Sequence, residues 1–209
     1  MTGTTVHLAV YDTFADWEPG FATAQLTRHG HTVRTVGLTA EPVTTMGGTR
    51  VLPDLALDGL RPEDSELLIL TGASLWDTGD DLAPFARAAR TFLDAGVPVA
   101  AICGATAGLA REGLLGERRH TSAVSFYLAA TGYAGGAHYE DADAVTDTGT
   151  GAGPDGVPRG ALVTAGPTEP VAFAREIFGL LGVFEPTKLD AWYRLFHDSD
   201  ASAYEVLEG

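Results

Sequence analysis

The 209-residue chain has one cysteine, Cys103, and only 13 basic residues against 28 acidic ones. A single cysteine cannot form a disulfide within the chain. The formal net charge of −15 repels phosphate groups, so we expect no nucleic acid and no anionic membrane as a partner. No hydrophobic run approaches the length of a membrane span, and residues 1–5 lead into a predicted strand rather than a signal peptide. These features predict a cytoplasmic protein.

Two ligand-binding patterns are also missing. No pair of His or Cys residues has the spacing typical of zinc ligands, so we expect neither a metal nor a cofactor. The segment 149–160 is rich in Gly and Pro, but no helix and no Lys-Ser/Thr pair follow its glycines, which argues against a phosphate-binding loop. We predict that this segment is a mobile loop joining two strands.

The residues that are present predict an α/β fold. Hydrophobic residues make up 45% of the chain, enough for one core, and we expect a single domain over residues 1–209. Apolar runs and helical spacing alternate along the chain. The predicted strands are 6–11, 32–37, 67–70, 97–102 and 161–164; the predicted helices are 16–29 with Asp16 as N-cap, 81–95, 123–130, 169–181 ending at Gly182, and a helical tail from about Pro186. Residues 46–49 predict the turn of a hairpin between Val43 and Leu52.

Cys103 lies where the buried strand 97–102 gives way to a helix, with small residues around the turn. This pattern is typical of a nucleophile elbow. The N–H groups at the start of a helix favour a thiolate and would stabilise an oxyanion beside it. The alternative is that Cys103 is a small buried hydrophobic residue, as many free cysteines are. We favour a reactive cysteine.

With this elbow, the chain resembles the ThiJ/PfpI superfamily, the class I glutamine amidotransferase-like proteins with a flavodoxin-like sheet. Further similarity lies in the strand-end turn 70–73, the hairpin 46–54, the late strand and turn 161–167, and the acidic residue in Asp16-Trp17-Glu18-Pro19. The resemblance extends nearly end to end. It implies a three-layer α/β sandwich with a mostly parallel sheet, and a homodimer. The apolar stripe around Trp192 in the tail is expected to pack in the core or between subunits, and is one candidate dimer surface.

Glu18 is the candidate partner of Cys103. It follows the first strand, and open α/β sheets bind ligands at the carboxyl ends of their strands. A carboxyl group there can share a proton with the sulfur and act as a general acid or base. Alternatively, Glu18 only complements the dipole of its helix. The resemblance implies the first role.

Other candidate residues surround this pair. His120 lies in the segment where the superfamily often places a histidine near its cysteine; alignment on the elbow and Gly116 puts that position nearer Ser122. His138 is a second candidate. We predict that backbone N–H groups of Gly104 and Ala73 stabilise an oxyanion, with Gly72 in the same turn. The two arginines before His120, Arg118 and Arg119, either bind a substrate carboxylate or form surface salt bridges.

Two departures from the superfamily's patterns narrow the function. Residues 166–170 contain no histidine, so they lack the His-x-Glu pair of true glutaminases. Gly104 follows the cysteine where PfpI-type peptidases place a histidine, which disfavours peptidase activity. Transcriptional regulators with this kind of domain add a DNA-binding helical module, and the acidic charge also argues against that function.

We therefore expect a cysteine-dependent enzyme acting on a small electrophilic molecule, as a hydrolase, a hydratase or a glyoxalase-like lyase. In this hypothesis Cys103 is the nucleophile and Glu18 moves the proton. The alternative is a redox-responsive stress or chaperone-like protein in which Cys103 is oxidised. A third possibility is a folded relic without activity, whose thiol would show ordinary reactivity.

Overall fold

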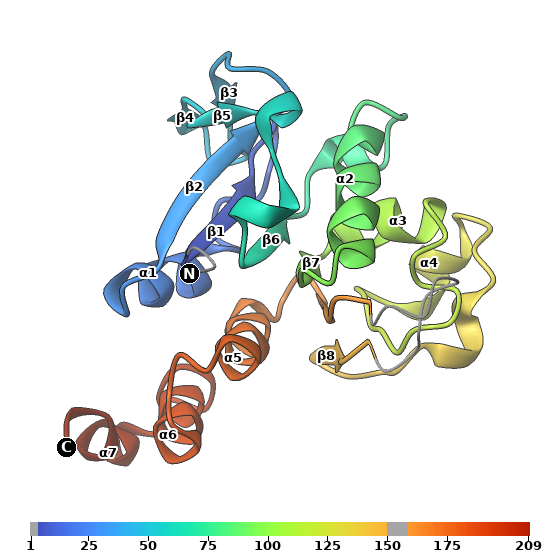
Figure 1. The fold of residues 1–209 in the computed structure, drawn as a ribbon. Helices are drawn as coiled ribbons and strands as arrows, with labels where there is room; N and C mark the ends of the chain where they lie inside the picture. The colour runs from blue at the N-terminus through green and yellow to red at the C-terminus, as the bar shows by residue number, and fades with distance from the viewer. Residues whose placement is uncertain (1–3, 150–158) are drawn as a thin grey trace.

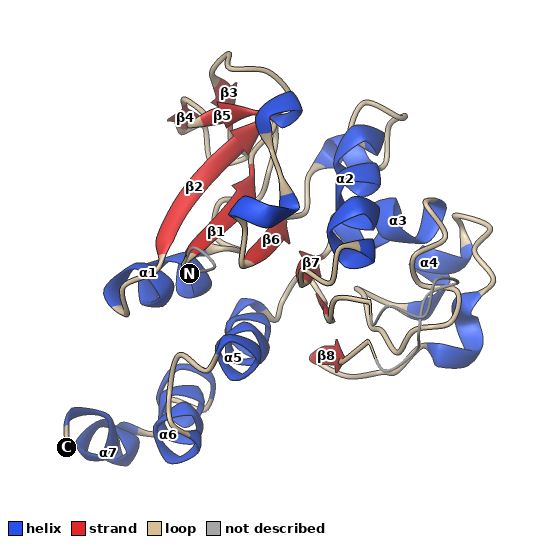
Figure 2. Cartoon of the chain, in the orientation of Figure 1, coloured by secondary structure: helices blue, strands red, loops and turns tan. Residues whose placement is uncertain are grey.

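A computed structural model describes residues 4–149 and 159–209 of the chain. It is an alternation of strands and helices (Figure 2). The strands are β1 Thr5–Ala9, β2 Thr32–Gly37, β3 Val43–Thr44, β4 Arg50–Val51, β5 Leu55–Ala56, β6 Leu67–Leu70, β7 Val99–Ile102, β8 Ala144–Asp147 and β9 Leu162–Ala165. The α-helices are α1 Gly20–Arg28, α2 Ala83–Asp94, α3 Gly104–Arg111, α4 Ser125–Ala129, α5 Pro170–Leu181, α6 Pro186–His197 and α7 Tyr204–Glu208.

Seven strands form the central sheet in the order β5-β2-β1-β6-β7-β9-β8. All neighbouring strands are parallel except β8 and β9. The order of β2, β1, β6, β7 and β9 is that of a flavodoxin-like sheet, and the direction of winding changes between β1 and β6. Ligands of such sheets bind outside the carboxyl ends of the strands beside this point. The fold therefore draws attention to the turns after β1, β6 and β7.

Helices cover both faces of the sheet, which confirms the predicted three-layer α/β sandwich. Helices α1 and α5 pack together on one face, with α6 behind α5, and α2 and α3 cover the other face (Figure 1). All four residues of β6, β7 and β9 are buried. Continuous burial explains why these strands are uniformly apolar or small rather than alternating with polar residues.

The structure confirms most of the predicted elements and corrects the start of the first helix. Helix α1 begins at Gly20, after Pro19 as N-cap, and no side chain caps it. Asp16 is not its N-cap, because its Oδ2 accepts a hydrogen bond of 2.8 Å from Thr45 Oγ1 in the β3–β4 hairpin. Asp16 therefore ties the turn before α1 to the hairpin. The predicted loop 149–160 does connect two strands, β8 and β9, but residues 150–158 lie outside the described part of the chain.

The tail from Pro186 is helical, as predicted, and its aromatic stripe packs within the chain. Trp192 is only 1% exposed, and its ring lies 4.9 Å from that of Phe178 and 5.1 Å from that of Phe196. Trp192 is thus part of the core, as one of the two predicted roles of the stripe requires, and its own ring is not available as a subunit surface. Phe196 remains 42% exposed. None of the described helices is long and apolar enough to cross a membrane.

Candidate active site

Cys103 occupies a sharp turn between β7 and α3. Its φ of 59° and ψ of −128° are unusual for a residue with a side chain, and they turn the chain abruptly from strand to helix. Backbone and side-chain bonds fix the turn: Cys103 N donates to Ala165 O at 3.0 Å, and Thr106 Oγ1 donates to Cys103 O at 2.6 Å. This is the geometry of the predicted nucleophile elbow. The residue as a whole is partly exposed.

Glu18 reaches the same point from the turn between β1 and α1. Its side chain is fully buried, and Oε2 accepts a hydrogen bond of 2.6 Å from the backbone N–H of Gly72, which follows β6. Its other oxygen, Oε1, accepts no hydrogen bond from the described residues. A Cβ atom on residue 72 would lie 2.8 Å from Cys103 Sγ and 2.9 Å from Glu18 Oε1. The sulfur and the free carboxyl oxygen thus lie beside the same missing side chain, and only glycine leaves room for both.

Burial raises the pKa of both groups. Desolvation raises the pKa of Glu18 to about 7, although the Gly72 N–H and the neighbouring thiol lower it in part. Desolvation and then the Glu18 carboxylate raise the pKa of the Cys103 thiol to about 12, while the Gly104 N–H lowers it. With a pKa of about 12 Cys103 is a neutral thiol near neutral pH, which corrects the expectation that the start of the helix holds it as a thiolate: burial outweighs the Gly104 N–H. The two groups hold at most one negative charge between them near neutral pH.

The two turns that carry the predicted oxyanion donors, after β6 and after β7, lie close together. A Cβ on Gly104 would lie 3.3 Å from Ala73 O, so the elbow and the turn after β6 are in near contact. The Gly104 N–H is directed toward the sulfur, which is why it lowers the pKa of the thiol. The N–H of Gly72 is already donated to Glu18, so Gly72 is not a free oxyanion donor and that prediction is corrected.

None of the hydrogen bonds that His120 forms with the described residues connects it to Cys103. It is fully buried, with Nδ1 2.7 Å from Arg118 O and Nε2 3.0 Å from Tyr133 Oη. Its ring also packs edge-on against Tyr139, and burial lowers its pKa. His138, the second candidate, is exposed, and its backbone oxygen accepts a hydrogen bond from the backbone N–H of His120. The structure thus gives both histidines partners away from Cys103 and Glu18.

The two arginines before His120 form ion pairs. Arg118 is 7% exposed, and its Nε lies 3.1 Å from Asp147 Oδ1 while Nη2 donates to Gly160 O at 2.6 Å. Arg119 pairs with Glu140 at 2.5 Å on the surface. Arg119 therefore matches the predicted surface salt bridge, whereas Arg118 forms its ion pair in a buried position, which corrects the expectation of a surface pair.

Two residues near the sulfur were not predicted from the sequence. Tyr127 on α4 donates a hydrogen bond of 2.7 Å to Asp77 Oδ1, just after the turn that follows β6. The charge of Asp77 adds to the rise in the pKa of Cys103, and Cys103 in turn raises the pKa of Tyr127, so the three groups are neighbours. No motif marks this pair, because Asp77 and Tyr127 are 50 residues apart and meet only in the folded chain.

The fold and the site together define the class of this protein. It is an α/β protein with a flavodoxin-like sheet, a cysteine on the elbow after β7 and a buried glutamate beside that cysteine. Residues 4–179 match the model of the DJ-1/PfpI family. The chain is also 37% identical over 201 residues to a Bacillus subtilis (strain 168) protein named "Uncharacterized protease YoaZ", covering 91% of this chain and 89% of that one. The protein belongs to the DJ-1/PfpI family.

Solved structures of relatives have the same fold. A thiJ/pfpI family protein from Bacillus anthracis is 34% identical and superposes with a TM-score of 0.88, covering 100% of this chain and 97% of that one. The DJ-1 superfamily protein Atu0886 from Agrobacterium tumefaciens is also 34% identical, with a TM-score of 0.80 and coverage of 95% and 99%. The similarity therefore includes the whole sheet and the C-terminal helices.

Proposed function

We propose that the protein is a cysteine-dependent enzyme that acts on small electrophilic molecules such as aldehydes or amides. Cys103 is the nucleophile, and Glu18 carries the proton. The observation that supports this role is the closeness of Cys103 Sγ and Glu18 Oε1, which lie on the same empty side of Gly72. A carboxyl group with a pKa of about 7 is matched to proton transfer at neutral pH.

The pKa values suggest that Glu18 acts first as a general base. As the Cys103 sulfur attacks the carbonyl carbon, the thiol proton passes to Glu18 and the π electrons of the carbonyl move to its oxygen. The N–H groups of Gly104 and Ala73 would stabilise that oxyanion. Glu18 then returns the proton, either to the oxyanion, which gives a hemithioacetal from an aldehyde, or to the nitrogen that leaves an amide, which gives a thioester.

In the amide case a water molecule completes the turnover. Water attacks the thioester carbon and gives a proton to Glu18, and this proton passes to the Cys103 sulfur as the C–S bond breaks. Gly104 and Ala73 would again bind the oxyanion. In the aldehyde case a 2-oxoaldehyde gives a hemithioacetal whose C1 proton can move to C2 through an enediol, which yields a 2-hydroxy thioester. Water then attacks the thioester carbon and the C–S bond breaks, which releases a 2-hydroxy acid and the Cys103 thiol. The arrangement is therefore compatible with a hydrolase, a hydratase or a glyoxalase-like lyase.

The experiment that tests this function is turnover of a panel of small 2-oxoaldehydes and aromatic amides by the wild type and by Cys103→Ala. We expect turnover of at least one class and its loss in the variant. Tyr204→Ala, which removes an exposed ring on α7, is the matched control and should retain full turnover. A folded Cys103→Ala protein with undiminished turnover would exclude a role for the sulfur.

A second function is favoured by the unpartnered Oε1 of Glu18. Beside a sulfinate, a protonated Glu18 would donate its hydrogen bond to a sulfinate oxygen, so the site could also stabilise an oxidised Cys103. This is a redox-responsive stress or chaperone-like role. Intact mass after mild peroxide treatment distinguishes it: a stable adduct of two oxygen atoms on Cys103 supports a sensor, and its absence argues against one. Ordinary thiol reactivity with neither turnover nor a stable adduct would indicate an inactive relic.

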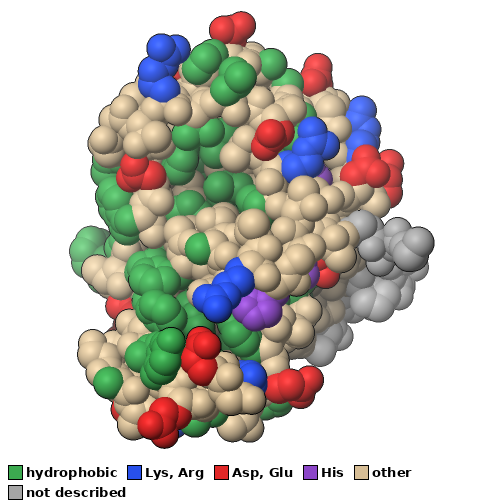
Figure 3. All heavy atoms as spheres, turned by 90° about the vertical axis from the view of Figure 1, so that its left-hand side faces the viewer, with side chains coloured by type: hydrophobic (Ala, Val, Ile, Leu, Met, Phe, Trp, Pro, Cys, Tyr) green, Lys and Arg blue, Asp and Glu red, His purple; other side chains and the backbone are tan. Residues whose placement is uncertain are grey.

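We also propose that the protein binds a small-molecule substrate as a cytoplasmic homodimer. Figure 3 shows several groups of exposed hydrophobic side chains on one face, with charges of both signs between them. Large hydrophobic side chains such as Met46 and Leu52 in the hairpin region are 48% and 69% exposed. Light scattering tests the assembly, and a monomer at micromolar concentration would contradict it.

A further inference from the structure

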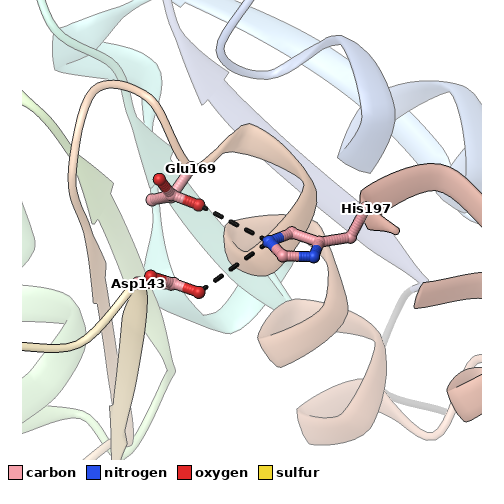
Figure 4. Close-up of side chains that lie close together, drawn as sticks. All are labelled: Asp143, Glu169 and His197. Atoms are coloured by element: carbon pink, nitrogen blue, oxygen red, sulfur yellow. Dashed lines mark ion pairs between the residues drawn. The ribbon is translucent and has the colours of Figure 1, made fainter. Parts of the chain in front are cut away.

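A cluster of metal-ligating side chains lies outside the Cys103 site. Asp143, which precedes β8, Glu169, the N-cap of α5, and His197, the last residue of α6, each direct one ligand atom toward the others, and these three atoms all lie within 4.8 Å of one another. Figure 4 shows both carboxylates turned toward the same ring nitrogen of His197. We propose that Asp143, Glu169 and His197 form a binding site for a divalent transition metal of the Zn²⁺ class.

The orientation of the histidine ring is the first argument. Its Nδ1 lies 2.6 Å from Asp198 Oδ1, so the N–H at Nδ1 is donated to that carboxylate. Its other nitrogen, Nε2, faces Asp143 Oδ2 at 3.8 Å and Glu169 Oε2 at 3.9 Å, distances too long for direct hydrogen bonds. Two carboxylate oxygens that converge on one ring nitrogen call for a positive charge at that point, which a metal ion would supply. A carboxylate on the other ring nitrogen is also the usual support of a metal-binding histidine.

The ligands are held in place before any ion arrives. The Gly166 N–H donates to Asp143 O, and the Glu169 N–H donates to Gly166 O, so one backbone segment links the two acidic residues. Thr168 Oγ1 donates to Glu169 Oε1 at 2.9 Å, which leaves Oε2 for the cluster. The His197 ring stacks on Tyr193 at 4.5 Å. An ion would thus bind to groups that are already ordered.

The donor set favours zinc over magnesium. One imidazole nitrogen and two carboxylate oxygens are common zinc ligands at about 2.0–2.2 Å, and water would complete the tetrahedron. Tetrahedral ligands at about 2.1 Å lie about 3.4 Å from one another. Nε2 would therefore approach each carboxylate oxygen by about half an ångström, and the two carboxylate oxygens would approach each other by up to about 1.4 Å. Mg²⁺ instead prefers oxygen ligands and retains its waters. The site lies on the carboxyl edge of the sheet, because Ala144 after Asp143 pairs with Ala165 of β9.

Sequence spacing did not predict this site, since its ligands are 26 and 28 residues apart. They meet because α6 folds back along α5, which brings its last turn to the N-terminus of α5 (Figure 1). An ion there would connect β8, α5 and α6. We therefore expect zinc to stabilise the fold as well as to bind.

The test is calorimetric titration of ZnCl₂ into the full chain carrying Cys103→Ser, which removes binding by the thiol. We expect one saturable site, and affinity weakened by about tenfold or more in His197→Ala and in Asp198→Asn. His31→Ala is the matched control, because His31 contacts a single carboxylate, Glu66, and should leave the affinity unchanged. Titration with MgCl₂ should give no saturable binding.

Two further measurements make the result decisive. Zinc should raise the Tm of the Cys103→Ser protein but not that of its Asp143→Asn form, and anomalous scattering should place the ion between Asp143, Glu169 and His197. Asp143→Asn is isosteric and exposed, so it also replaces His197→Ala if that variant does not fold. Absence of saturable zinc binding, or binding that all of these substitutions leave unchanged, would show that His197 is simply an imidazolium paired with carboxylates.

Discussion

Glu18 Oε2 accepts a hydrogen bond of 2.6 Å from the backbone N–H of Gly72, and this bond positions the carboxyl group beside the cysteine elbow. The glutamate comes from the turn after β1 and the glycine from the turn after β6, so the bond links the two strands between which the sheet changes its direction of winding. One carboxyl oxygen is fixed by this bond, and the other is left for the sulfur.

Substituting Gly72 by alanine should disrupt the site. The added methyl group would lie 2.8 Å from Cys103 Sγ, and side chains on both sides would have to move. We expect a destabilisation of about 1–3 kcal/mol, as for other overpacked sites, together with loss of turnover. Urea unfolding and the substrate panel measure the two effects. Gly136→Ala is the control because nothing lies within 4 Å of its added methyl group, and equal effects of both substitutions would contradict the steric argument.

Glu18→Gln should separate ionisation of the sulfur from catalysis. The amide carries no negative charge, so the pKa of Cys103 should fall below its wild-type value and alkylation at pH 8 should be faster. Turnover should nevertheless fall by about 10²–10⁴-fold, because the general base is gone. Iodoacetamide labelling across pH, followed by intact mass, measures the first effect. A variant that is alkylated more slowly than wild type would mean that Glu18 promotes the thiolate instead.

The stability of the protein should depend on pH through Glu18. Its pKa of about 7 in the folded chain exceeds the ordinary value of 4.5, so the folded state keeps a proton that the unfolded chain releases. The resulting stabilisation is complete below about pH 4.5 and is lost as pH rises through 7, by roughly 3 kcal/mol in total. Urea unfolding at pH 4.5 and pH 8 should show that Glu18→Gln loses less stability than wild type. Parallel pH profiles would be inconsistent with a raised pKa.

Trp192 should contribute strongly to the packing of the C-terminal helices. It is 1% exposed and contacts several aromatic rings, so Trp192→Ala should cost about 3–5 kcal/mol of unfolding free energy. Trp192→Phe should cost less, since it keeps a ring and removes an indole N–H that has no partner among the described residues. Phe126→Ala, at a 76% exposed position, should change stability by less than about 0.5 kcal/mol.

Much of the fold could be predicted because its signals are local. The apolar segment 67–70 and the run before Cys103 are buried strands, and Gly182 ends α5 with a φ of 65°, as its position predicted. The two-residue strand β5 was not predicted, because so short a segment has no periodicity. Helix α1 starts later than expected because Asp16 bonds to the hairpin, which its own neighbours in sequence do not indicate.

Only those site residues could be predicted whose position is set by the end of a strand. Glu18 and Cys103 both follow parallel strands, and the structure places them together at one edge of the sheet; their catalytic roles remain predictions. The approach of Asp77 to Tyr127 depends on how α4 packs against α3, and one hydrogen bond of His120 depends on Tyr133. Contacts of this kind join distant turns and have no local pattern.

Because Cys103 has a positive φ, glycine at this position would favour stability, whereas the proposed reactivity requires cysteine. A residue with a side chain at that conformation costs of order 1–3 kcal/mol, whereas glycine adopts it freely. Cys103→Gly should therefore give a more heat-resistant but inert protein. Random variation selected for thermal resistance alone would tend to remove the sulfur.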